Sequence, residues 1–96
     1  MFEWDAAKAA TNLAKHGVSF EEAATVFADA AALDGADIKH SASEPRFYLV
    51  GQPSAGRVLS VAYTVRSVAH GETIRLITAR RASRTERRAY EGTAPH

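Results

Sequence analysis

The sequence predicts an α+β fold in which an N-terminal helical hairpin packs on an antiparallel β-sheet, followed by a C-terminal helix. Three observations predict it. Apolar residues recur at helical spacing over residues 5–28. Strand-like apolar runs separated by short turns fill residues 46–80. Ser83 with Glu86 three residues later has the spacing of a capping box, which marks the start of a last helix. At 96 residues, the chain 1–96 is expected to form a single domain.

The first helix is expected to start after Asp5 and to end at Gly17. An aspartate is a good N-cap because its carboxylate accepts hydrogen bonds from the unpaired N–H groups of the first turn. A glycine readily adopts the left-handed conformation that ends many helices. Leu13 shares one helical face with several alanines, and we expect that face to be buried. Residues 2–4 form a candidate short strand before the helix.

A second helix is expected to begin after Ser19 and to fade near Asp29. Ser19 and Glu22 have the spacing of a capping box. Since little more than Gly17 and Val18 joins the two helices, the sequence predicts a tight hairpin of antiparallel helices.

The sheet is expected to be a three-stranded antiparallel meander, because short turns connect its strands. The expected strands are residues 46–52, 57–66 and 73–80, with turns at 53–56 and 67–72, a short edge strand at 30–34 and a loop at 35–45. Both sheet faces carry apolar residues, so the N-terminal helices should cover one face, and the last helix or a partner protein the other. The side chains expected in the core include Leu13, Phe20, Phe27, Val61 and Leu76.

Composition excludes several classes of site. The chain has no cysteine, which rules out disulfides and thiolate metal ligands. The histidines have no metal-ligand spacing, so we expect no metal and no cofactor; they are His16, His40, His70 and His96. No apolar stretch approaches the roughly 18–20 residues that span a bilayer, and the chain start lacks the basic and apolar segments of a secretory signal. A cytoplasmic protein without membrane contacts is expected.

Charge is distributed unevenly along the chain. Residues 1–56 carry four basic and eight acidic side chains, whereas residues 57–96 carry eight arginines against three acidic side chains. Guanidinium groups match phosphate oxygens bidentately and stack on bases. The C-terminal half therefore indicates either a polyanionic partner or an arginine-rich solvated surface, and charge alone favours neither.

Several spaced motifs in one order resemble the BrnT family of toxins, and together they cover the chain from Phe2 to about Glu91. The N-terminal part of the resemblance consists of residues 2–5, Lys8, Asn12 and residues 15–23. The middle and C-terminal parts consist of Glu44, Arg46, Phe47, Gly51, residues 56–64, Arg66, Ile74, Arg75, residues 79–82, Glu86, Arg87 and Tyr90.

This resemblance implies a fold similar to RelE-type ribonucleases and a toxin that degrades RNA. It also implies an antitoxin of the ribbon-helix-helix type, encoded next to the toxin, which silences the toxin in a hetero-oligomeric complex. The complex would contact operator DNA only through the antitoxin. The alternative is a non-catalytic arginine-rich module that binds RNA or protein within a repressor complex.

A metal-independent ribonuclease must deprotonate the ribose 2′-OH, stabilise charge on the phosphoryl oxygens and protonate the leaving 5′-oxygen. Side chains of the right types make up the candidate catalytic set: Arg80, Arg66, Arg46, Glu86, His16 and Tyr90. Further side chains are candidates for RNA binding: Lys15, Tyr63, Arg81, Arg84, Arg87 and Arg88.

Arg80 is the strongest candidate, because it lies at the end of an expected strand, where a side chain is held by the sheet yet reaches solvent. The alternative is a structural ion pair with Glu86. Arg66 should lie at the opposite end of the meander from Arg80, and Arg46 near Arg66. His16 is either a general acid or base or a capping residue of the first helix.

Overall fold

The computed structural model describes residues 1–36, 46–54, 56–69 and 71–93. The elements in chain order are β1 (Phe2–Glu3), α1 (Ala6–His16), α2 (Phe20–Ala24), the 3₁₀-helix η1 (Thr25–Ala28), β2 (Leu33–Ala36), β3 (Phe47–Gly51), β4 (Leu59–Val68), β5 (Gly71–Arg81) and α3 (Arg84–Thr93). The strands form one five-stranded sheet in the order β1-β5-β4-β3-β2. Strand β1 runs parallel to β5, and the other neighbours are antiparallel. The α+β class and the central meander are confirmed.

Two expectations for the strands need correction. The residues expected as a loop at 67–72 belong almost entirely to the β4–β5 hairpin, whose strands stay paired up to Val68 opposite Gly71. The edge strand expected at 30–34 is displaced to Leu33–Ala36, where it pairs with β3. Most of the expected loop 35–45 lies outside the described residues.

The helix ends follow the capping chemistry of the sequence. Asp5 Oδ1 accepts a hydrogen bond from the Lys8 N–H at 3.0 Å, and Gly17 ends α1 with φ of 68°. Ser19 Oγ accepts from the Glu22 N–H at 3.0 Å. The reciprocal bond of a capping box is formed at α3, where Glu86 Oε1 accepts from the Ser83 N–H at 2.7 Å.

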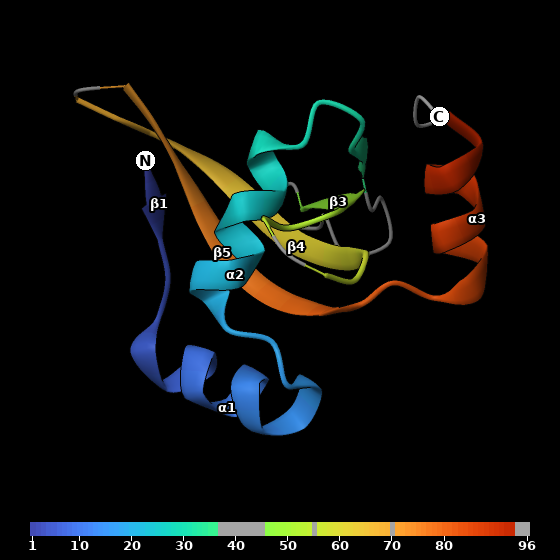
Figure 1. The fold of residues 1–96 in the computed structure, drawn as a ribbon. Coiled ribbons are helices and arrows are strands. Elements are labelled where there is room, and N and C mark those ends of the chain that lie inside the picture. Colours follow the sequence, from blue (N-terminus) through green and yellow to red (C-terminus); the bar gives the residue numbers. More distant parts are fainter. Residues whose placement is uncertain (37–45, 55, 70, 94–96) are drawn as a thin grey trace.

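The tight antiparallel helical hairpin is not confirmed. Helices α1 and α2 each pack mainly against β5, and Figure 1 shows α1 crosswise at one end of the sheet while α2 runs along its face. The second helix is also short, since the chain tightens into η1 before Asp29. Helix α3 stands at the side of the molecule away from the tip of the β4–β5 hairpin (Figure 1).

The core lies between β3, β4 and β5 and the N-terminal helices. Phe20, Val61 and Leu76 are buried as expected. Phe27 is only partly buried, with its ring 4.9 Å from the ring of Tyr63. Leu13 is 52% exposed, so the expectation that it is buried was wrong.

Helix α1 faces β5 through Asn12 instead of Leu13. The Asn12 side chain is only 5% exposed. Its Nδ2 donates to the carbonyl oxygens of Val18 (3.0 Å) and Ala79 (2.8 Å), and its Oδ1 accepts from the Ala79 N–H at 3.0 Å. Since β1 pairs with β5 only at Ile74 and Arg75, the Asn12 amide takes the place of a neighbouring strand at Ala79. One buried amide thus joins α1, the α1–α2 connection and the sheet.

A β-bulge in β5 changes which sheet face the following side chains point to, up to the arginines at the end of the strand. Ala62 pairs with Thr78 and Tyr63 with Leu76, which leaves Ile77 as the extra residue. Beyond the bulge, Ala79 faces the core and Arg80 the opposite sheet face, next to Ser60.

The second sheet face is not an open apolar surface. Ser60, Ala62 and Thr64 alternate on that face of β4 and are at most 3% exposed in the chain by itself. Helix α3 packs against β3, as one of the two expected covers. The expectation that a partner protein covers this face is therefore wrong for the middle of β4.

Candidate ribonuclease site at the junction of β5 and α3

Arg80 and Glu86 meet where β5 gives way to α3. Arg80 Nη1 and Nη2 donate to Glu86 Oε1 and Oε2 at 2.9 and 3.0 Å, a bidentate pair. Arg80 Nη1 also donates to the Arg81 carbonyl oxygen at 3.0 Å. The hydrogen bonds between them raise the pKa of the Arg80 guanidinium and lower the pKa of the Glu86 carboxyl. Both groups are therefore charged and fixed, with the Arg80 side chain 41% exposed.

A cleft of about 440 Å³ opens beside this pair, between the end of β5, helix α3 and the turn before β4. We call it the arginine cleft. Its lining residues are Gln52, Gly56, Arg57, Val58, Arg81, Ala82, Arg87, Tyr90 and Glu91. Arg81 and Arg87 are exposed, and neither has an acidic partner among the residues that the structure describes. Three arginines, Arg57, Arg81 and Arg87, and one acidic residue, Glu91, thus line the cleft.

Tyr90 anchors the far end of α3. Its hydroxyl donates to Asp29 Oδ2 at 2.7 Å, and the same carboxylate accepts from the backbone N–H groups of Gln52 and Ala31, both at 2.9 Å. The bond from the Gln52 N–H, followed by that from Tyr90, lowers the pKa of Asp29, and the bond to Asp29 raises the pKa of Tyr90. Since its proton is held by Asp29, Tyr90 is better suited to shape the cleft than to protonate a leaving group.

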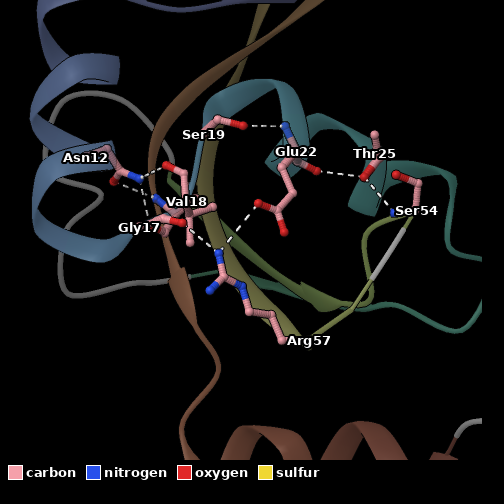
Figure 2. A network of polar contacts seen from close by, with 9 residues as sticks. Asn12, Gly17, Val18, Ser19, Glu22, Thr25, Ser54 and Arg57 are labelled. Carbon is pink, nitrogen blue, oxygen red and sulfur yellow. Dashed lines mark hydrogen bonds and ion pairs between the residues drawn. The ribbon is translucent and has the colours of Figure 1, made fainter.

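Arg57 was not among the residues singled out for a site. Its Nη2 donates to the Gly17 carbonyl oxygen at 2.7 Å and lies 3.6 Å from Glu22 Oε1, so the end of α1 and the first turn of α2 hold it in place (Figure 2). The turn that carries it is held in the same way, with the Ser54 N–H donating to Thr25 Oγ1 at 2.9 Å. The only signal in the sequence was the Gly56-Arg57 pair within the family resemblance.

Lys15 and His16 line a second hollow, between α1 and the bulged part of β5. It measures about 360 Å³, and its lining residues are Ala7, Lys8, Thr11, Asn12, Lys15, His16, Ile77 and Thr78. His16 directly precedes Gly17, whose carbonyl oxygen binds Arg57 of the arginine cleft. The C-terminal end of α1 is therefore connected to the cleft through the hydrogen bond between Gly17 and Arg57.

Arg46 and Arg66 lie elsewhere. Arg66 is level with Thr73 on β5, seven residues from Arg80, which corresponds to about 23 Å at roughly 3.3 Å per residue. Arg46 precedes Phe47, the partner of Tyr63, and so lies at the same end of the sheet as Arg66. The register supports both expectations about their positions, and the two arginines do not join Arg80.

The remaining candidates divide between the core and the surface. The Tyr63 hydroxyl donates to both carboxylate oxygens of Asp34 at 2.8 Å, and burial, followed by this bonding, raises the pKa of Tyr63. Its ring is part of the core. Arg84 and Arg88 are exposed on α3 and are not among the lining residues of the arginine cleft.

Among the described residues, no three acidic or histidine side chains gather closely enough to hold a metal ion. His40, His70 and His96 lie outside the described residues. In the part of the chain that the structure describes, no helix is both long and apolar enough to cross a bilayer.

Comparison with known proteins places the chain in a class of proteins. Residues 4–86 match the model of a family of ribonuclease toxins of type II toxin–antitoxin systems. That family is BrnT, and the chain belongs to it. The crystal structure of the ribonuclease toxin BrnT of Brucella abortus has a similar fold, with a TM-score of 0.62 and 23% sequence identity over 88% of this chain and 99% of that one. No curated protein matches the chain.

Membership in the family makes the chain a ribonuclease toxin with RNA as its substrate and an antitoxin as its protein partner. The similarity to the Brucella structure supports the BrnT fold. The expected arrangement of RelE-type ribonucleases stays a prediction.

Proposed function

We propose that this toxin cleaves RNA at the junction of β5 and α3, by attack of the ribose 2′-OH on the adjacent phosphorus and without a metal ion. The observation that carries the proposal is the rigid Arg80–Glu86 pair beside the arginine cleft. Preorganised positive charge at the developing phosphoryl charge is the main requirement of such a reaction. Guanidinium groups supply here the charge that metal ions supply in other nucleases.

Each residue of the junction has a role in this proposal. Arg80 contacts the scissile phosphate and stabilises its transition state. Glu86 positions Arg80, because a carboxylate with a lowered pKa and both oxygens hydrogen-bonded is a poor general base. His16 is the proposed general acid or base, since imidazole side chains as a class exchange protons near neutral pH and His16 adjoins the cleft through Gly17.

The other candidates contribute to binding in this proposal. Arg84 and Arg88 attract RNA from the exposed surface of α3, and Lys15 does so from the end of α1. Arg46 and Arg66 contact RNA outside the catalytic site, at the other end of the sheet. We expect the toxin to act on RNA in the cytoplasm.

Cleavage of RNA is expected to be unchanged by excess EDTA, because the proposed charge stabilisation comes from arginines. The measurement is the single-turnover rate with and without the chelator, on protein purified without added metal. Loss of activity on chelation, with recovery on adding zinc or magnesium, would show that a metal takes part.

We further propose that the antitoxin is of the ribbon-helix-helix type, and that the complex contacts operator DNA only through it. Toxin and antitoxin are expected to copurify after coexpression and to elute together in size-exclusion chromatography at micromolar concentration. Growth arrest should follow expression of the toxin alone and disappear when both are expressed. Separate elution of the two folded proteins would contradict a stable complex.

A second candidate function is a module that binds RNA or protein without cleaving it. The specific observation in its favour is that Glu86 occupies two nitrogens of Arg80, which is also the geometry of a structural ion pair. The two functions differ in whether substitution of Arg80 changes a catalytic step.

A further inference from the structure

We propose that the arginine cleft is a phosphate-binding subsite for one nucleotide of the RNA strand next to the cleaved bond, with Arg57 as its fixed ligand. This inference rests on the proposed function in naming RNA as the polymer. A volume of about 440 Å³ lies within the range of roughly 300–1,000 Å³ that is common for small-molecule sites, so the cleft admits a nucleotide and not only a phosphate ion.

Arg57 is held before any ligand arrives. The hydrogen bond to Gly17 and the ion pair with Glu22 both use Nη2. Among the described residues Nη1 and Nε make no other hydrogen bond, so both can serve a ligand that enters from the cleft, which Arg57 helps to line. Because Glu22 lies 3.6 Å away, and both side chains are about one-third exposed, it orients Arg57 without neutralising it fully. A preorganised guanidinium loses little conformational freedom when it binds a phosphate.

Arg81 and Arg87 complete the subsite from the other side. Arg81 extends from the end of β5, and Arg87 from the first turns of α3, which Tyr90 and Glu86 tie to the rest of the fold. Guanidinium groups without acidic partners around a hollow are a binding site for a multiply charged anion. The apolar atoms of Val58, Ala82 and the Tyr90 ring form a surface for the sugar or base.

Arg81 directly follows Arg80 along β5, and Glu86 directly precedes Arg87 along α3. The proposed catalytic pair and the cleft are therefore neighbours through both elements. An RNA strand that passes the end of β5 reaches both, so the cleft binds a phosphate flanking the scissile one.

The test uses a short single-stranded DNA of mixed sequence, which carries the same phosphates but lacks the 2′-OH and is not cleaved by the proposed chemistry. Fluorescence anisotropy gives its affinity at several salt concentrations. Arg57→Gln, Arg81→Gln and Arg87→Gln should each weaken binding about 10-fold. Each should also lower the slope of log affinity against log salt by about 0.7, the value for one phosphate contact on a single strand.

Arg84→Gln is the matched control, because Arg84 lies on the same helix as Arg87, is exposed and is not among the lining residues of the cleft. It should weaken binding by less than about 3-fold, as expected for long-range attraction. Glu91→Gln should tighten binding, since it removes the one carboxylate among the lining residues of the cleft. Circular dichroism melting curves check that each variant is folded.

Equal losses at Arg84 and at the cleft arginines, or weaker binding by Glu91→Gln, would overturn the subsite. If the wild-type protein cleaves RNA but the cleft variants bind DNA as tightly as the wild type, the subsite is rejected and the proposed function is retained. If only the cleft variants lose DNA binding but the wild-type protein cleaves no RNA, the subsite is retained and the proposed function is rejected.

Discussion

Arg80→Ala is expected to slow single-turnover cleavage at saturating RNA by about 10²–10³-fold. Arg80 is the fixed cation of the proposed site, held by two hydrogen bonds to Glu86 at 2.9 and 3.0 Å. Removal of a preorganised charge acts on the transition state, so saturating substrate does not restore the rate. In cells the variant should lose toxicity while it stays folded and still binds its antitoxin.

Arg84→Ala is the control for this experiment. Arg84 is exposed on the first turn of α3, so its loss should weaken RNA binding by less than about 3-fold, without a comparable rate defect at saturating RNA. Glu86→Gln adds a second comparison, because it keeps the size of the side chain but loosens Arg80. We expect it to lose less activity than Arg80→Ala. Equal and small effects of Arg80→Ala and Arg84→Ala would remove Arg80 from the site and favour the binding module.

Asn12→Ala should lower the free energy of unfolding by about 3–5 kcal/mol, since it leaves three buried backbone groups without partners at about 1–3 kcal/mol each. These are the N–H and carbonyl of Ala79 and the carbonyl of Val18. Urea denaturation followed by circular dichroism measures the change.

The neighbouring residue gives the matched control for Asn12. Leu13→Ala should cost only about 0.5–1 kcal/mol, because Leu13 is 52% exposed. Judged by hydrophobicity alone, the order of the two effects would be reversed. A larger loss for Leu13→Ala than for Asn12→Ala would show that α1 packs on its apolar face and not through Asn12.

Local chemistry made much of the fold predictable. Asp5, Gly17 and Ser83 mark helix ends because capping is a contact between residues close in sequence. The choice of Asn12 over Leu13 depends on Ala79, 67 positions along the chain, whose side away from β4 has no neighbouring strand. Hydrophobic periodicity carries no information about such a partner.

The arrangement of the candidate site could be predicted to a similar extent. Arg80, Glu86, Arg81, Arg87 and Tyr90 come together because they lie within eleven positions of each other, across one strand–helix junction. The separation of Arg66 from Arg80 follows from the antiparallel register.

Tertiary contacts decided the rest of the site. Arg57 is held by the carbonyl oxygen of Gly17, 40 positions away, and the Tyr63 hydroxyl donates to Asp34, 29 positions away. Neither contact leaves a pattern of spacing in the sequence, so the position of Arg57 and the structural use of Tyr63 emerged only from the fold.

Cleavage through the ribose 2′-OH is tested most directly by one comparison. The folded wild-type chain is incubated in EDTA with an RNA and with its 2′-deoxy counterpart, each with and without ribosomes, and the product ends are identified. We expect the RNA to be cut, with 2′,3′-cyclic phosphate ends, and the DNA to remain intact. Absence of RNA cleavage under every condition, or equal cleavage of the DNA, would contradict the proposed reaction.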